Sequence, residues 1–323
     1  MEIYTTKDKT VSKFVHNDGS ETAIKTVGTC NKIFNPMTEQ LSVQEDRNKY
    51  VVFISSSVGC PVKCKFCYLT AKKFPYYTLT SQEIIENVKR ALDLKISESP
   101  ELRDKYIKLS FMGMGDAQFS CNQLSFISVK IMDYVLKNGY ALGLDSIDVG
   151  TTLPNKNTIF LFISNMNWLN EIANKYQRNP LAIKNSTPAR LFFSLHSFDQ
   201  KIRGGLIPPT KNYNPVEKAL QLQTYADTDL IFHQIFFKGI NDSDEQVDSF
   251  IQTYNKYFQN NELRVLQLNE CEHSRVEKTD RSKKILQKLN DNIEFLKVQH
   301  SAGSEIKASC GQFLMRKMEV LKW

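Results

Sequence analysis

Residues 50–70 read YVVFISSSVGCPVKCKFCYLT, an apolar run that leads directly into three closely spaced cysteines. The run at 50–56 is short and rich in β-branched and aromatic residues, which predicts a buried β-strand. The loop after it holds Cys60, Cys64 and Cys67 in the spacing C-x3-C-x2-C. Because the chain has an odd number of cysteines, seven, and no secretion signal, this clustering predicts a metal site in a reducing compartment and not a disulfide framework.

The bulk composition is that of a globular protein. The chain has 323 residues, 41% hydrophobic and 24% charged, enough for one large domain or two small ones. No apolar run is long enough to span a bilayer, and the N-terminus lacks the apolar core of a signal peptide. We therefore expect a cytoplasmic protein with no membrane partner. A net charge of +7 is compatible with a nucleic-acid partner but equally with a basic enzyme.

Strand and helix patterns alternate from residue 49 onward. Strands are predicted at residues 50–56, 106–113, 146–152, 190–197, 230–237 and 263–269, with 293–300 as a candidate last strand. Helices are predicted at residues 79–94, 122–137, 156–176, 214–226, 244–258 and 279–291. Such a series predicts a parallel sheet wrapped by helices, either a full or partial barrel or an open doubly wound sheet. Residues 1–48 look like an appendage with a hairpin around Asp18-Gly19.

The polar motifs of the chain follow the predicted strands. They are the cysteine loop, GMGDA at 113–117, GTTLPN at 150–155, SLHS at 194–197 and LNECE at 268–272. The carboxyl ends of parallel strands meet at one edge of a sheet or one face of a barrel. The sequence therefore predicts that these motifs form one site.

Three thiols in one loop suit an iron–sulfur cluster. A cluster with four iron corners is normally held by four cysteine thiolates, so three thiolates leave one iron open to nitrogen and oxygen atoms of a ligand. A structural zinc ion normally takes four protein ligands. The alternative is thus a zinc loop with a distant fourth ligand, Cys121 or Cys271.

The cysteine spacing resembles the signature of the radical S-adenosylmethionine (SAM) superfamily. Further stretches resemble the dual-specificity adenine methyltransferases of ribosomal and transfer RNA and their antibiotic-resistance relative. They are SSSVGCPVKCKFC at 55–67, FMGMGDAQFS at 111–120, LFFSLHSFDQKIRGGLIPPTKNYN at 191–214, FKGINDSDEQ at 237–246 and ASCGQF at 308–313. The matches come in family order and cover about residues 10–315. The resemblance implies an α/β fold with a partial (β/α)6 TIM-like barrel at 49–323, including a C-terminal cysteine loop, after a short N-terminal β extension at 1–48.

The resemblance also implies cofactors and site residues. Cys60, Cys64 and Cys67 would hold a 4Fe-4S cluster, whose open iron would bind the amino and carboxylate groups of SAM. Reductive cleavage of SAM would then give methionine and a 5′-deoxyadenosyl radical, with the protein positioning the cofactor. The implied SAM-binding residues are Gly113, Met114, Gly115, Asp116, Thr151, Thr152, Ser194, His196 and Asn269. Taken by themselves, the serine and threonines are as compatible with capping, and His196 with a core position.

Cys310 is the implied catalytic residue. In the family this cysteine takes a methyl group from one SAM, and the radical from a second SAM then abstracts hydrogen from the S-methyl group. The methylene radical adds to an amidine carbon of adenine. A thiolate is the nucleophile that the first step requires. The implied partners are SAM, an RNA or nucleotide substrate, and a reducing electron donor such as flavodoxin or ferredoxin.

The chain departs from the family pattern in two places. Phe53 stands where the family has a second cysteine, which resolves the covalent protein–RNA adduct. The residues before Cys60 are also too few for the N-terminal helical module with which family members grip RNA. Asp116 and Ala117 replace a glutamate and a proline, changes that we expect to be tolerated.

Three hypotheses follow from these departures. The first is methyl synthesis through methylated Cys310 on an RNA adenine or related substrate, with Cys30, Cys121 or Cys271 replacing the missing thiol or with no second thiol needed. The second is a diverged radical SAM reaction on a nucleotide, small molecule or peptide. The third is a non-catalytic iron–sulfur or RNA-binding relative.

Overall fold

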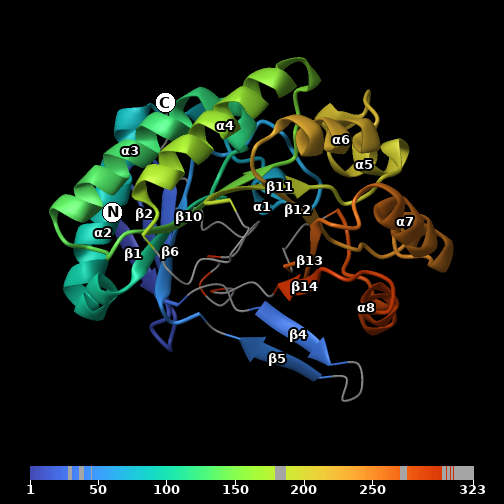
Figure 1. Cartoon of the computed structure of the whole chain (residues 1–323), viewed down its shortest axis with the longest axis horizontal. Coiled ribbons are helices and arrows are strands. Elements are labelled where there is room, and N and C mark those ends of the chain that lie inside the picture. The colour runs from blue at the N-terminus through green and yellow to red at the C-terminus, as the bar shows by residue number, and fades with distance from the viewer. Residues whose placement is uncertain are drawn as a thin grey trace.

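The computed structural model describes most of the chain. The described residues are 1–27, 31–35, 40–44, 46–178, 187–269, 275–299, 303, 306 and 308, with 31–35 and 40–44 described by their backbone. Figure 1 shows a curved sheet with an arc of helices, from α2 to α8, around its outer side. The strands β4 and β5 lie at the side that this arc leaves uncovered (Figure 1).

Seven parallel strands form the middle of the sheet. They are β6 (Lys49–Ile54), β9 (Tyr106–Phe111), β10 (Leu144–Thr151), β11 (Ala189–Ser194), β12 (Asp229–Gln234), β13 (Glu262–Leu266) and β14 (Leu296–Gln299), paired in that order. The six predicted strands are all present, and the candidate strand at 293–300 is confirmed as β14. This mostly parallel sheet confirms the predicted α/β fold and is consistent with a partial TIM-like barrel.

Helices follow the strands and cover the outer face of the sheet. The longer ones are α2 (Ser81–Glu98), α3 (Cys121–Lys137), α4 (Ile159–Tyr176), α6 (Pro215–Tyr225), α7 (Asp244–Tyr257) and α8 (Ser282–Asn290). Two shorter helices are α1 (Tyr68–Ala71) and α5 (Gln200–Leu206), and short 3-10 helices occur at Pro100–Asp104, Ala117–Ser120, Lys156–Thr158 and Pro208–Thr210. Each of the six longer helices buries an apolar face. The helix that begins after Thr80 has the capping box with Glu83 that its sequence favours.

The N-terminal residues contribute strands to both edges of the parallel sheet. β1 (Glu2–Thr5), β2 (Val11–Val15) and β3 (Glu21–Lys25) are antiparallel, and β3 pairs with β6. The hairpin predicted around Asp18-Gly19 is the β2–β3 turn. β4 (Asn31–Asn35) and β5 (Gln40–Gln44) form a second hairpin, and β4 pairs with β14 at the opposite edge. The strands before and after residue 48 belong to one continuous sheet. The division of the chain into 1–48 and 49–323 therefore stays a prediction.

A separate two-stranded sheet flanks the cysteine loop. It pairs β7 (Ser57–Val58) with β8 (Tyr77–Thr78) and so closes the loop that carries the three cysteines. Within the described ranges, no helix combines the length and the apolar character that crossing a membrane requires.

Candidate functional site

The concave side of the sheet encloses a cavity of about 240 Å³. Its wall is built from the cysteine loop, from the ends of the parallel strands and from the N-terminal strands β2 and β3. The residues predicted for the site that line it are Cys60, Cys64, Cys67, Gly113, Gly115, Asp116, Thr151, Thr152, Ser194 and Asn269. The structure thus brings most of the residues that sequence reasoning selected to a single cavity.

The cysteine loop is held in shape by its own backbone. At Gly59, which has a positive φ of 66°, a Cβ atom would lie 2.1 Å from the Pro75 carbonyl oxygen, so glycine is required here. The Cys67 amide donates to the Cys64 carbonyl at 3.1 Å. The Cys67 carbonyl accepts from the amides of Thr70 and Ala71, both at 3.1 Å, and starts α1. These backbone contacts therefore define the path of the chain from Gly59 through Cys67 into α1.

The environment of the thiols fits an iron–sulfur cluster. Burial, followed by the nearby Asp116 carboxylate and Cys67, raises the pKa of Cys60 to about 12. Burial and the neighbouring cysteines also hold the pKa of Cys64 well above its usual range. Thiolates in this loop therefore need a positively charged partner, which the iron of a cluster supplies, and three thiols match its donor set.

The alternative of a zinc ion held by Cys121 finds no support in the described part of the chain. Cys121 begins α3 and packs in the main hydrophobic core, whereas the three loop cysteines pack in two other apolar clusters. No group of three or more His, Cys, Asp or Glu side chains among the described residues is arranged to hold a single metal ion. Cys30 and Cys271 lie outside the described residues.

The GMGD segment is fitted against the chain that enters the cysteine loop. The Gly113 amide donates to the Ile54 carbonyl at 3.1 Å, and a Cβ on Gly113 would lie 2.7 Å from that carbonyl carbon. Gly115 has a φ of 101°, and its Cβ would lie 2.5 Å from the hydroxyl oxygens of Ser56 and Ser57. We predicted that these glycines admit a ligand, and the structure adds a second reason, since neighbouring backbone and serines occupy the space that a side chain would need.

Met114 stands apart from the other predicted SAM-binding residues. Its side chain is 1% exposed and does not line the cavity in the described structure. It packs instead with Leu69, and Cys60 and Cys67 border this small cluster. Met114 therefore stabilises the cysteine loop by packing against it.

Asp116 joins the ends of β9 and β10. One carboxylate oxygen accepts from the Gln118 amide at 3.1 Å and the Thr151 hydroxyl at 2.6 Å. The other accepts from the Thr152 amide at 2.7 Å and the Thr152 hydroxyl at 2.8 Å. Burial raises the pKa of Asp116, and these four hydrogen bonds oppose that effect. Four donors fill the acceptor positions of a carboxylate, so Asp116 positions the two threonines and would contact an ammonium group only by releasing one of them.

His196 supports the loop from the side. It is 2% exposed, has a φ of 61°, and its Nδ1 accepts from the Ile235 amide at 3.2 Å, which leaves the proton on Nε2. Burial, followed by the charge of Arg203, holds the pKa of His196 well below its usual range. Its ring meets Phe66, the residue before Cys67, edge-on at 4.7 Å between centroids. His196 therefore orders the cysteine loop through Phe66, and in the described structure its side chain does not line the cavity.

Arg203 is a site residue that we did not predict. It comes from α5, its side chain is fully buried, and it donates to the carbonyl oxygens of Ser194 at 2.8 Å, of Leu195, and of Thr152 at 2.6 Å. Its guanidinium also lies 4.8 Å from the ring centroid of Phe193. It therefore ties the end of β11 to the segment after β10. The signal was present in the basic residues after SLHS, but no periodicity shows that one of them turns inward.

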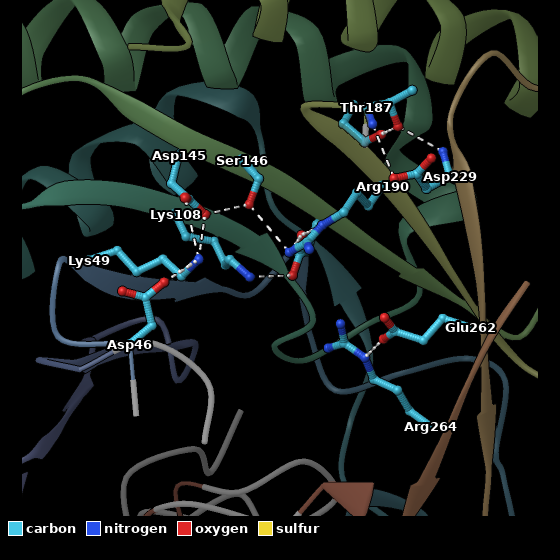
Figure 2. A network of polar contacts seen from close by, with 12 residues as sticks. Asp46, Lys49, Lys108, Asp145, Ser146, Thr187, Arg190, Asp229, Glu262 and Arg264 are labelled. Carbon is cyan, nitrogen blue, oxygen red and sulfur yellow. Dashed lines mark hydrogen bonds and ion pairs between the residues drawn. The ribbon is translucent and has the colours of Figure 1, made fainter. Parts of the chain in front are cut away.

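A cluster of charged side chains in the interior of the sheet was also not predicted. Lys108, Arg190 and Arg264 extend from β9, β11 and β13 into the concave side (Figure 2). Asp148 on β10 accepts from the Lys108 ammonium at 3.2 Å and from the Arg190 guanidinium at 2.9 and 2.7 Å. Burial raises the pKa of Asp148, but these cations outweigh burial and lower it to about 2. The alternation of polar and apolar residues along a strand does not show whether a charged side chain faces solvent or the interior, so these four residues could not be assigned to the interior from the sequence.

The structure also bears on Phe53, where the family has its second cysteine, and on Cys310. Phe53 is partly buried on β6 and lines the cavity. A phenyl ring therefore occupies the position on the cavity wall where the family has its second thiol. Cys310 lies outside the described residues. Ala308, two positions before it, lines the same cavity.

Comparisons with known proteins agree with the sequence motifs. The chain is 27% identical over 272 residues to the "Probable RNA methyltransferase" of Stutzerimonas stutzeri (strain A1501), covering 83% of this chain and 69% of the relative. It is 26% identical over 324 residues to the "Dual-specificity RNA methyltransferase RlmN" of Wolinella succinogenes, covering 97% of this chain and 82% of the relative. No family model matches the chain.

A solved structure shares the fold. The crystal structure of a radical SAM methyltransferase from Sphaerobacter thermophilus superposes with a TM-score of 0.65 at 20% identity. The superposition covers 97% of this chain and 80% of that one. Together with the relatives, this fold supports the resemblance predicted from the motifs: the chain is similar in sequence to the dual-specificity RNA methyltransferases and shares its fold with a radical SAM methyltransferase.

Proposed function

We propose that the protein holds a 4Fe-4S cluster through Cys60, Cys64 and Cys67, binds SAM beside it, and performs methyl synthesis through methylated Cys310 on an RNA adenine or a related substrate. The observation that carries the proposal is the convergence of the three cysteines and the strand-end motifs on one cavity. Ala308 on the cavity wall supports a role for Cys310 there, since only one residue separates them.

A cluster held by Cys60, Cys64 and Cys67 would supply the electron for reductive cleavage of SAM to methionine and a 5′-deoxyadenosyl radical. The chain supplies position and a dry surrounding. Asp116 fixes Thr151 and Thr152 at the end of β10, and Arg203 fixes the neighbouring carbonyls at the end of β11. Val62, Leu206 and Phe237 pack with Cys64 in one apolar cluster, which keeps this thiol buried.

Phe53 favours a second candidate function, a radical SAM reaction that does not proceed by methyl transfer. A phenyl ring on the cavity wall can neither donate a proton nor form the disulfide that releases a cysteine-linked adduct. Cys121, which could have replaced the missing thiol, packs in the main core. This second function would act on a nucleotide, small molecule or peptide.

The accessory partners also remain proposals. The reaction needs a reducing electron donor, for which flavodoxin or ferredoxin is the expected class. A cytoplasmic location is expected from the cysteine usage, since thiols and clusters persist in a reducing compartment.

The test uses anaerobically reconstituted protein with dithionite as reductant. We expect iron and sulfide in the ratio of a 4Fe-4S cluster and cleavage of SAM to 5′-deoxyadenosine, both lost in Cys64→Ser. Protein that carries zinc and no iron would refute the proposal. Mass spectrometry of the Cys310 peptide separates the two candidates, because a gain of one methyl group supports methyl synthesis and an unmodified thiol supports the second function.

A further inference from the structure

The cavity has a second end, below the level of the cysteine loop, that is rich in positive charge. Lys25 on β3 is in register with Val51, and Val51 with Lys108, so the two lysines belong to one level of the wall. Arg264 and Asp148 line the same cavity, and Arg264 on β13 is in register with His233 on β12. Lys108 and Arg190 share the carboxylate of Asp148, and Arg264 and Lys297 share that of Glu262, so four cationic side chains are paired with two carboxylates.

Arg264 is held in a fixed orientation with its outer nitrogens available. Its Nε donates to Glu262 and its guanidinium lies 4.8 Å from the ring centroid of Phe192. The side chain is 7% exposed, and its two terminal nitrogens have no acceptor among the described residues. Figure 2 shows Glu262 to one side of Arg264, which leaves the fork of the guanidinium directed away from that carboxylate. A guanidinium fork fixed in this way matches two oxygens of an oxyanion.

His233 provides an independent observation. It is 8% exposed, lines the cavity from β12, and its ring lies 4.9 Å from that of Phe192. Its Nε2 is buried and has no hydrogen-bond partner in the described structure. Because buried polar atoms are rarely left without a partner, this nitrogen indicates a ligand that the protein alone does not provide.

We propose that Arg264 and His233 form a binding subsite for a phosphate monoester group in the cavity. The substrate then carries a phosphate group at one end, held by these two side chains. An excess of buried positive charge is costly unless an anion compensates it, and a phosphate dianion balances two cations. The Nε2–H tautomer of His233 and the Arg264 fork donate to its oxygens. The reaction at the other end rests on the proposed function, whereas the subsite does not.

Isothermal titration of the reconstituted full-length protein with inorganic phosphate tests the subsite, with adenosine monophosphate, adenosine and succinate as further probes. We expect phosphate and adenosine monophosphate to bind, and Arg264→Gln to weaken both at least tenfold. Arg264→Lys should weaken them less, because it keeps the charge and loses the fork. Arg90→Gln, the same change on the exposed face of α2, is the matched control and should bind as the parent does.

Three results would overturn the subsite: no phosphate binding by the parent protein, equal affinity in Arg264→Gln, or succinate binding as tightly as phosphate. His233→Phe keeps the contact with Phe192 and removes Nε2, so we expect it to weaken phosphate binding several-fold. This variant is the second test if circular dichroism shows that Arg264→Gln is unfolded. SAM cleavage is measured on the same preparations. Phosphate binding without cleavage fails the proposed function alone, and cleavage without phosphate binding fails the subsite alone.

Discussion

The fully buried Arg203 offers the sharpest test of how the strand ends are held. The perturbation is Arg203→Met, which keeps much of the length and apolar volume of the side chain and removes its five donors. Three carbonyl oxygens, of Thr152, Ser194 and Leu195, then lose the donor that Arg203 provides. Because the ends of β10 and β11 are linked through this one guanidinium, both should loosen together.

The magnitude follows from the contacts. Hydrogen bonds from a charged donor contribute about 1.5–3 kcal/mol each, and the lower value applies because the guanidinium itself had to be desolvated and pairs with no carboxylate among the residues that the structure describes. Three such bonds at about 1.5 kcal/mol, less some relaxation of the segments, give a loss of about 4 kcal/mol in the free energy of unfolding. Arg203→Lys keeps the charge but cannot reach three carbonyls at once, so it should lose about half as much.

Urea denaturation followed by circular dichroism measures these losses, with Arg90→Met on the exposed face of α2 as control. The control should change the free energy of unfolding by less than about 0.5 kcal/mol. SAM affinity of the folded variants provides a second measurement, and Arg203→Lys should bind SAM more weakly than the control. A free energy of unfolding for Arg203→Met within about 1 kcal/mol of the parent would refute the reasoning, since the carbonyls would then have found other partners.

Three further predictions concern single positions. Asp116→Asn replaces an acceptor oxygen with an NH2 group that faces the donors of Thr151 or Thr152. We expect the free energy of unfolding, measured by urea denaturation, to fall by about 2–3 kcal/mol. An unchanged denaturation midpoint would contradict the hydrogen-bond pattern. Gly115→Ala should destabilise by about 1–3 kcal/mol because of its φ of 101° and the two serine hydroxyls, whereas Gly205→Ala in α5, where a Cβ meets nothing within 4 Å, should be neutral or stabilising. Burial lowers the pKa of His16 to about 4 and that of His233 to about 3, so unfolding takes up protons below the ordinary histidine pKa of about 6.5 and stability falls as pH decreases from there. At pH 5 each histidine should cost about 2 kcal/mol relative to pH 8, and His233→Asn should flatten the measured pH dependence; an identical slope in the variant would show that His233 is not buried neutral.

The parallel part of the fold could be predicted because its signals are local. Each of the six predicted strands is a short apolar run, and each predicted helix has an apolar face at helical spacing, so the order of strands and helices follows from neighbouring residues alone. The convergence of the cysteine loop and the GMGD, GTT and SLH segments followed from the same reasoning, since parallel strands end on one side.

The edges of the sheet could not be predicted in this way. β4 pairs with β14 across more than 250 residues of chain, and nothing in Asn31–Asn35 specifies a partner so distant in sequence. α5 was missed because two adjacent glycines, Gly204 and Gly205, lower the helix propensity of a seven-residue segment whose N-cap is Asp199. At Gly204 the reason is packing, because a Cβ there would lie 2.7 Å from the Lys211 Cα.

Thr152 connects the parts of the site that were predicted with those that were not. Its amide and hydroxyl donate to Asp116, and its carbonyl accepts from Arg203 and, at 3.3 Å, from the Tyr213 hydroxyl. Every polar group of this residue is therefore used inside the protein, and Asp116 has no acceptor position left over. The chain has aspartate where the family it resembles has glutamate, and the shorter side chain reaches the threonines of the next strand. Asp116 and Arg203 thus act on a ligand through the backbone that they hold, so that replacing either should change the affinity for SAM in the same direction.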